Sequence, residues 1–255
     1  MKLFGYPVPD ESGAVTLTRT EGEFADMLMN ITVYRMKAGE TRRFHLPEEE
    51  MALLLVEGCV DYQWPDGRQT ADRKDFFREG AYCLHVCHDV PVTVTAHRES
   101  ELLVQSTVNS GSFPAVFYTP QTIREETFGQ GQFDAKAQRT VRTFFDYASA
   151  PYSNMVMGEI LQPQGGWSSY PPHQHPQPEV YYYRFDKPQG FGSCFIGDDV
   201  FRIQDRSFCA IPGGKTHPQV TAPGYPMYYV WMIRHFDGYP WTERIFDPAH
   251  AWLLE

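Results

Sequence analysis

The chain has 255 residues, of which 42% are hydrophobic and 15% aromatic, so it can bury a sizeable core as one large or two ordinary domains. Its 22 basic and 32 acidic side chains give a net charge of -10, which excludes the positive footprint of a nucleic-acid-binding protein. An anionic sugar acid is not excluded, because a bound cation and one or two local arginines set the field inside a pocket.

The sequence shows neither an export signal nor a disulfide framework. The N-terminus, MKLFGYPVPD, lacks the run of about 7–15 apolar residues of a secretory signal, and no segment approaches the roughly 20 apolar residues of a membrane helix. The five cysteines are an odd number at scattered spacings, without a CxxC pair. We therefore expect a cytoplasmic protein without a membrane partner, in which Cys83 and Cys87 are buried free thiols.

Short runs rich in β-branched and aromatic residues predict strands along the whole chain. In chain order they cover residues 31–36, 52–56, 92–96, 102–105, 179–183 and 227–233. Turns that contain proline and glycine recur between such runs, as is typical of a sandwich or barrel. Helical periodicity is confined to two short segments, 21–29 and 135–142. The predicted fold class is all-β.

A weak internal repeat divides the chain into two halves. Each half carries a glycine, a histidine six or seven residues later, then glutamate and an apolar or aromatic run. These positions are Gly39, His45, Glu49 and Glu50 in the first half and Gly166, His173 and Glu179 in the second. Two copies of one β-barrel unit explain the pattern, with the polar stretch 119–138 as their connection. We place the boundary near residue 130, with domains at 1–130 and 131–255.

The strongest local signal is the segment PPHQHPQPE, residues 171–179. Its four prolines exclude a helical pair of ligands, because helix interiors tolerate proline poorly. In an extended chain His173 and His175 lie on one face, roughly 6.6 Å apart at about 3.3 Å per residue, so both imidazoles can reach one ion. Glu179 begins the next strand, and the turn PGGKTH brings in His217. Three nitrogens and one oxygen predict a site for one divalent metal ion, with zinc, manganese, iron and nickel as candidates.

The first half has lost much of this pattern. His45 and one of the glutamates at 49–50 correspond to two of the ligands, but a proline replaces the second histidine and a valine aligns with the last. We expect this half to be a scaffold barrel. His85 and His88 lie nearby in the sequence and leave open a second, irregular metal site.

The two ligand motifs resemble the signatures of the cupin superfamily, His-x-His followed by Glu and a later Pro-x-Gly-x-x-His. Here they read HQHPQPE and PGGKTH. The resemblance implies a bicupin, two tandem double-stranded β-helix (jelly-roll) barrels with the metal in the second.

Longer strings narrow the resemblance. The chain resembles the 5-deoxy-glucuronate isomerase family of myo-inositol breakdown, which is itself related to the 4-deoxy-5-keto-uronate isomerases of pectin breakdown. The strings that carry this resemblance are GGWSSYPPHQH, PEVYYYRF, PQGFG, THPQVTAPGYPMYYVWM and DPAHAW. The likeness is dense over residues 140–252. It implies a cytoplasmic aldose–ketose isomerase of carbohydrate metabolism that converts 5-deoxy-D-glucuronate to 2-deoxy-5-keto-D-gluconate in inositol catabolism. Segment 231–235 departs from the small, glycine-containing ending usual in the family.

Such an isomerase needs a group that moves a proton between two neighbouring carbons and a group that holds the sugar-acid carboxylate. Strand alternation places Tyr181 and Tyr183 on the ligand-bearing face of their strand, which makes them candidates for proton transfer, and Lys215 is a third. Arg184 and Arg234 are candidates for binding the carboxylate. For all of these residues the alternative is structural: the tyrosines fill the barrel, the lysine is solvated, and the arginines lie at a surface or interface.

Other functions remain open on this sequence. A paralogous isomerase of another uronate-like acid, an oxygen-activating cupin dioxygenase and a non-catalytic sugar-binding cupin all suit a metal in a barrel. Iron dependence with oxygen consumption favours the dioxygenase, whereas an isomerase works anaerobically. No output segment such as a helix-turn-helix is apparent for a sensor. We also expect a homo-oligomer, because two barrels with extensive sheet edges commonly pair, and a native-mass measurement tests this.

Overall fold

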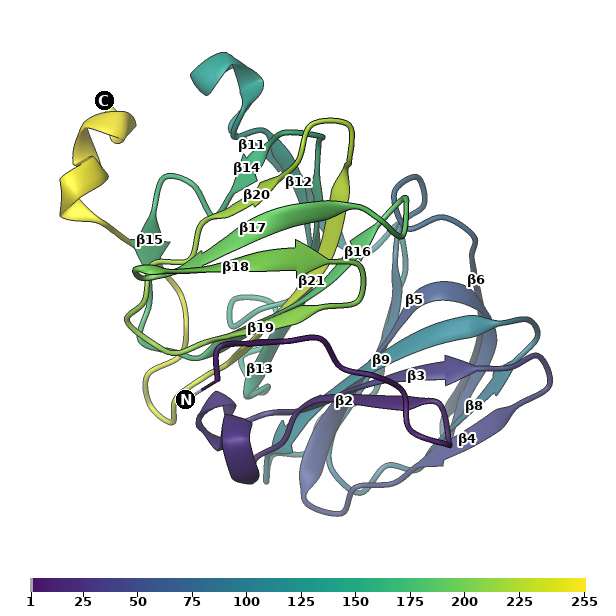
Figure 1. Ribbon diagram of the computed structural model, residues 1–255. Helices are drawn as coiled ribbons and strands as arrows, with labels where there is room; N and C mark the ends of the chain where they lie inside the picture. Colours follow the sequence, from purple (N-terminus) through teal and green to yellow (C-terminus); the bar gives the residue numbers. More distant parts are fainter. Residues whose placement is uncertain (1) are drawn as a thin grey trace.

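The structure, a computed structural model, describes residues 2–255 and consists mainly of antiparallel strands in curled sheets (Figure 1). The all-β prediction is confirmed, and all six predicted strands coincide with or lie within observed ones. In the described part of the chain, no helix combines the length and apolarity needed to cross a membrane.

The strands of the first half form one nine-stranded sheet. They are β2 (Ala14–Thr18), β3 (Asn30–Met36), β4 (Thr41–Phe44), β5 (Glu49–Trp64), β6 (Gly67–Arg73), β7 (Tyr82–Val86), β8 (Val92–Ala96), β9 (Ser100–Val108) and β10 (Val116–Tyr118). The long β5 bends at Gly58, where a side chain would collide with Ser100 and the backbone φ is +129°. Before the bend β5 pairs with β7, and after it with β6 and β8.

The second half contains three sheets. The seven-stranded sheet comprises β1 (Phe4–Gly5), β11 (Arg124–Phe128), β12 (Arg139–Phe145), β13 (Met155–Gln162), β16 (Glu179–Phe185), β19 (Phe208–Ile211) and β21 (Met227–Arg234). The smaller sheets comprise β14 (Trp167–Ser168), β17 (Phe191–Ile196), β18 (Asp199–Gln204) and β20 (Gln219–Thr221), and β15 (His173–Gln174) with β22 (Ile245–Phe246). Although β1 and β11 precede residue 130, they pair within this half, and the domain boundary stays a prediction.

The described helices are short and of the 3-10 type: η1 (Gly22–Met27), η2 (Phe133–Ala135) and η3 (Pro248–Leu254). The first lies within the helix predicted over 21–29. The helix predicted over 135–142 is wrong, because residues 139–145 form β12 between β11 and β13. The side chains alternate there as in a strand: Val141 packs in the core of the second half, whereas Arg142 reaches Glu159 on the opposite face of the sheet.

Each half has its own apolar core, and a third core lies between the halves, which pack side by side (Figure 1). The residues of β16 alternate between two of these cores. Tyr181 and Tyr183 point into the core of the second half, whereas Val180 and Tyr182 point into the core between the halves. The predicted alternation of the three tyrosines is therefore confirmed, and it directs one face of β16 toward the candidate ligands.

Candidate metal centre

The structure brings the four predicted ligands together in the second half. Single ligand atoms of His175, Glu179 and His217 lie within 4.8 Å of one another, and no other trio of potential metal-binding side chains within residues 2–255 gathers in this way. The ring of His173 lies beside that of His217, with 5.1 Å between the centroids. All four side chains are buried.

Two turns dock against each other to build this cluster. The amide of Gly214 donates to the His175 carbonyl at 2.8 Å, which joins the segment of the first two histidines to the turn that precedes His217. Gly213 permits this approach, because a side chain there would overlap the backbone of Pro176. Glu179 is fixed in turn by its place at the start of β16, between β19 and β21.

The three histidines share one orientation. The Nδ1 atoms of His173, His175 and His217 lie 2.9 Å from the backbone carbonyls of Pro171, Gln177 and Lys215, respectively. Because a carbonyl oxygen only accepts, each Nδ1 carries a proton and each neutral ring keeps its Nε2 lone pair free. Such outer hydrogen bonds orient metal-binding histidines in proteins.

The distances within the cluster suit one ion. Oε2 of Glu179 lies 3.2 Å from Nε2 of His175 and 3.2 Å from Nε2 of His217. Two atoms that each lie about 2.0–2.2 Å from one metal, at tetrahedral or octahedral angles, are themselves about 2.8–3.6 Å apart. Residues and spacing therefore fit a divalent metal.

The charge states of the cluster also suit a metal. Burial, helped by the neighbouring His217, holds the pKa of His173 well below its ordinary value, and burial lowers the pKa of His217 as well. Burial alone would raise the pKa of Glu179, but the adjacent His175 and His217 more than offset it, so that pKa is lowered. At neutral pH His173 and His217 are therefore neutral and Glu179 is ionised, and these are the forms that bind metals.

A narrow cavity of about 40 Å³ opens beside the ligands, and it contains only one of the predicted proton-transfer candidates. Tyr181 lines it, with its hydroxyl 3.1 Å from Ser169 Oγ. Tyr183 does not line it, because its hydroxyl donates to Gln219 Oε1 at 2.6 Å deeper in the barrel. Lys215 is exposed and contributes its backbone carbonyl to His217. The geometry therefore supports Tyr181 but neither Tyr183 nor Lys215 as a group that touches substrate.

Both predicted carboxylate-binding arginines lie outside the cavity wall. Arg184 is buried between the halves, where it pairs with Glu101 of β9 at 2.5 Å and with Asp205 at 3.0 Å. Arg234 donates to Thr107 of β9 at 3.0 Å and to the carbonyl of His235. These interactions support the structural alternative for both residues, because their guanidinium groups already connect elements of the fold.

The cavity is instead lined by two arginines and two tryptophans that the sequence had not identified as site residues: Arg139, Arg244, Trp231 and Trp241. Trp231 lies over Gly158 of the paired strand, where a side chain would collide with its indole. Trp241 and Arg244 come from the segment after β21, which reaches the site because β22 pairs with β15. Arg139 at the polar start of β12 and Arg244 near the C-terminus belong to no motif that would have identified them in the sequence.

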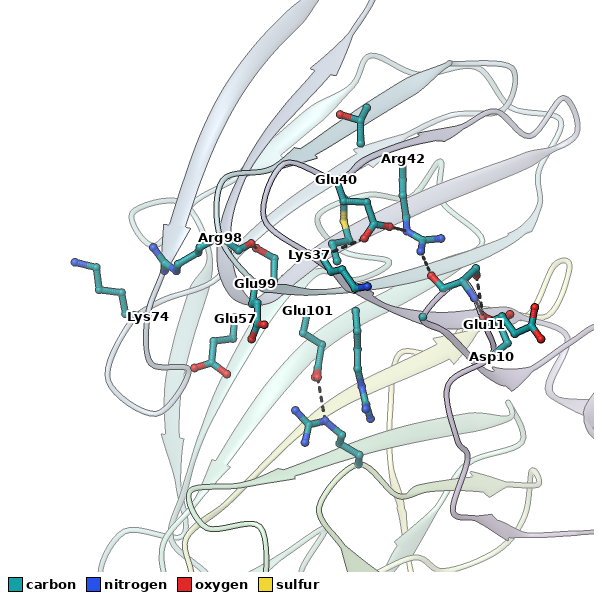
Figure 2. A pocket seen from close by; sticks show the side chains of 17 residues that line it. Asp10, Glu11, Lys37, Glu40, Arg42, Glu57, Lys74, Arg98, Glu99 and Glu101 are labelled. Atoms are coloured by element: carbon teal, nitrogen blue, oxygen red, sulfur yellow. Dashed lines mark hydrogen bonds and ion pairs between the residues drawn. The ribbon is translucent and has the colours of Figure 1, made fainter.

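A larger cavity lies elsewhere, in an open groove of about 1000 Å³ beside the contact between the halves. Figure 2 shows that its walls carry charges of both signs, with Glu40 bound to Arg42 and Glu101 bound to a guanidinium group. Arg206 provides that second contact, 3.2 Å from Glu101. The lining includes neither histidine nor cysteine. We therefore assign the functional site by its chemistry to the small cavity and not by size to the groove.

The histidines of the first half have other partners. His45 Nε2 lies 2.7 Å from Asp89, and His85 Nε2 lies 2.9 Å from the buried Glu50 and stacks on Phe145. In the described part of the chain these side chains do not gather into a group of three ligands. All five cysteines are free, and Cys83 and Cys87 are buried as predicted.

Comparison with known proteins gives the family. The model of the KduI/IolB family matches residues 6–253. The 5-deoxy-glucuronate isomerase of Geobacillus thermodenitrificans (strain NG80-2) is 26% identical over 97% of this chain and 93% of its own length. That of Bacillus subtilis (strain 168) is 24% identical over 88% of this chain and 86% of its own. These relatives support an isomerase.

Solved structures agree on the fold. An IolB-like protein from Salmonella typhimurium LT2 superposes with a TM-score of 0.88 at 24% identity, covering 100% of both chains. A Lactobacillus farciminis oxalate decarboxylase in a formate complex has a TM-score of 0.70 at 12% identity, covering 100% of this chain and 90% of its own. The second likeness indicates a cupin-like β-barrel fold. With a family model that spans nearly the whole sequence, the chain belongs to the KduI/IolB family.

Proposed function

We propose that this protein is a metal-dependent aldose–ketose isomerase that converts 5-deoxy-D-glucuronate to 2-deoxy-5-keto-D-gluconate in the cytoplasm, as a step of inositol catabolism. The observation that carries the proposal is the buried cluster of His173, His175, Glu179 and His217, in a chain whose relatives are named for this isomerase. The proposal includes a bicupin in which the second barrel holds the metal and the first is a scaffold.

The chain supplies candidate metal ligands, a phenol that can donate a hydrogen bond, and an apolar wall for the cavity. A divalent metal held by His173, His175, Glu179 and His217 would polarise the substrate carbonyl and the neighbouring hydroxyl. Burial and the charge of Glu179 hold the pKa of Tyr181 well above its ordinary value, so its phenol is protonated at neutral pH. Tyr181 therefore donates a hydrogen bond to a substrate oxygen. Trp231 and Trp241 line the cavity and give it an apolar wall.

The test is turnover by metal-loaded protein. Wild type incubated anaerobically with 5-deoxy-D-glucuronate is expected to lose the aldehyde signal and gain the ketone signal by NMR. No turnover refutes the assignment, and turnover of a different uronate alone identifies a paralogous isomerase. Oxygen-dependent turnover identifies a dioxygenase instead.

A pair of variants tests the ligands separately. His175→Ala is expected to lose bound metal, measured by elemental analysis, and activity with it. The matched control is His250→Ala, because His250 is exposed in η3 and is not part of the cluster. Full activity in His175→Ala after loss of its metal contradicts the site.

A further inference from the structure

Two guanidinium groups share one aromatic ring in the wall of the metal-site cavity. The Cζ atoms of Arg139 and Arg244 lie 5.5 and 5.8 Å from the ring centroid of Phe128, and Arg244 also lies 5.8 Å from that of Trp241. Arg139 comes from the start of β12 and Arg244 from the segment before β22. Segments that are distant in sequence therefore place two positive charges beside the ligand cluster.

Neither of these arginines has an acidic partner within residues 2–255. Arg73, Arg142 and Arg184, the arginines whose side chains are most buried, all form ion pairs with carboxylates. Arg139 donates to the Ala137 carbonyl at 2.9 Å, but its Nε atom is buried without a hydrogen-bond partner. The one carboxylate in the cavity, Glu179, is held by His175 and His217.

The partly buried guanidinium of Arg139 is unfavourable without an anion, because it stays charged and loses part of its hydration. Burial lowers the pKa of Arg139, which expresses the same penalty. An anion that enters the cavity and pairs with Arg139 would offset this penalty. The planar, two-pronged guanidinium is suited to a carboxylate, and the guanidinium of Arg139 lies over the ring of Phe128.

We propose that Arg139 and Arg244 bind the carboxylate of the substrate and hold the acid end of the sugar while its carbonyl end meets the histidine–glutamate cluster. The assignment of the two ends rests on the proposed function. The anion site itself rests on the unpaired arginines. It makes the cavity selective for an acid over a neutral sugar of the same length.

The two arginines differ in exposure. Arg139 is partly buried at the start of β12, whereas Arg244 is exposed at the mouth. The cavity of about 40 Å³ has room for one or two water molecules, so a six-carbon acid enters only if its wall opens. Arg244 and Trp241, on the C-terminal segment, are placed to move. Arg139 then forms the fixed side of the carboxylate site, and Arg244 closes on the bound carboxylate from the other side.

The test compares an acid with a neutral sugar in a binding assay that needs no turnover. The probes are D-glucuronate and D-glucose, which differ in one terminal group, titrated calorimetrically into metal-loaded protein. Wild type is expected to prefer D-glucuronate, and Arg139→Met and Arg244→Met are each expected to weaken its binding by about 10- to 100-fold. Arg202→Met is the matched control, because Arg202 also stacks on a ring, that of Phe191, but lies outside the cavity.

Two results overturn the carboxylate site: equal affinity of wild type for both probes, or wild-type affinity for D-glucuronate in both variants. Thermal unfolding checks that the variants are folded, and Arg244→Met, at an exposed position, carries the test if Arg139→Met is not. If 5-deoxy-D-glucuronate is not turned over but D-glucuronate binding needs both arginines, the proposed function fails and the carboxylate site stands. If 5-deoxy-D-glucuronate is turned over and its KM is unchanged in both variants, the proposed carboxylate site is refuted and the proposed function stands.

Discussion

Replacing Arg184 by methionine separates a structural role from a substrate-binding one. The side chain is buried and pairs with Glu101 and Asp205, whose carboxylates are also buried. Glu101 belongs to the first half and Arg184 to the second, so the substitution removes an ion pair that joins the halves. Because Arg184 does not line the metal-site cavity, we expect the variant to lose stability and to keep its affinity for substrate.

The size of the loss follows from what remains around Glu101. Removing one partner of a buried ion pair costs about 3–5 kcal/mol. Arg206 remains at 3.2 Å and the Tyr182 hydroxyl at 3.1 Å, so we expect the lower end, about 3 kcal/mol. For a chain of this size that corresponds to a fall in Tm of roughly 6–12 °C.

Urea and thermal unfolding measure the stability, and steady-state kinetics on the same preparation measure KM. Arg206→Met is the comparison, because Arg206 contacts the same carboxylate but is 36% exposed and is expected to cost less. A variant of Arg184 with stability within about 0.5 kcal/mol of wild type and a KM raised about tenfold would refute the reasoning and restore the substrate-binding interpretation.

Two further predictions concern the cavity and its C-terminal wall. Tyr181→Phe removes the hydroxyl of a residue that lines the cavity and is expected to lower kcat by about 100-fold or more. Tyr183→Phe leaves the buried amide oxygen of Gln219 unpaired and is expected mainly to lower the stability by about 1–3 kcal/mol. Equal effects of the two substitutions on kcat would contradict the placement of these tyrosines. Burial and the charge of Arg234 lower the pKa of His235 to about 4, and its Nδ1 accepts a hydrogen bond from the Trp241 amide. Because this folded-state pKa lies below the ordinary value of about 6.5, stability from the neutral ring is complete above about pH 6.5 and declines as the pH falls toward 4. The unfolding free energy of His235→Gln, measured from pH 7.5 to 4.5, is expected to fall less steeply than that of wild type, and identical slopes would exclude this contribution.

The candidate ligand cluster was predictable because its geometry is local. His173, His175 and Glu179 lie within seven residues of each other in a segment whose prolines keep it extended, and the glycines at 213–214 make the turn that brings in His217. Strands were predictable for a similar reason, since side-chain alternation is a property of the strand itself. The same alternation places Arg184 on the face of Tyr182, opposite to the face of Glu179. Strand alternation alone therefore predicts that Arg184 points away from the candidate ligands.

The remaining wall was not predictable because it depends on register between distant segments. Arg139 reaches the cavity only because β12 pairs with β13, and residues 135–142 had helical periodicity in isolation. Arg244 reaches it only because β22 pairs with β15, two strands of two residues each. Interactions of this kind follow from the assembled fold, and single-residue patterns do not encode them.

The two faces of the sheet next to the candidate site contribute to different parts of the molecule, so the first half can support the site without supplying any of the four candidate ligands. In β21, Tyr229 and Trp231 face the core that contains the metal site, whereas Tyr228 faces the other half. Its hydroxyl donates to the buried Glu159 at 2.8 Å, and Glu159 also binds Arg73 of the first half at 2.8 Å. Residues that alternate along one strand therefore contribute in turn to the site and to the contact that supports it. A substitution on the first face should alter metal or substrate binding, and one on the second should alter stability.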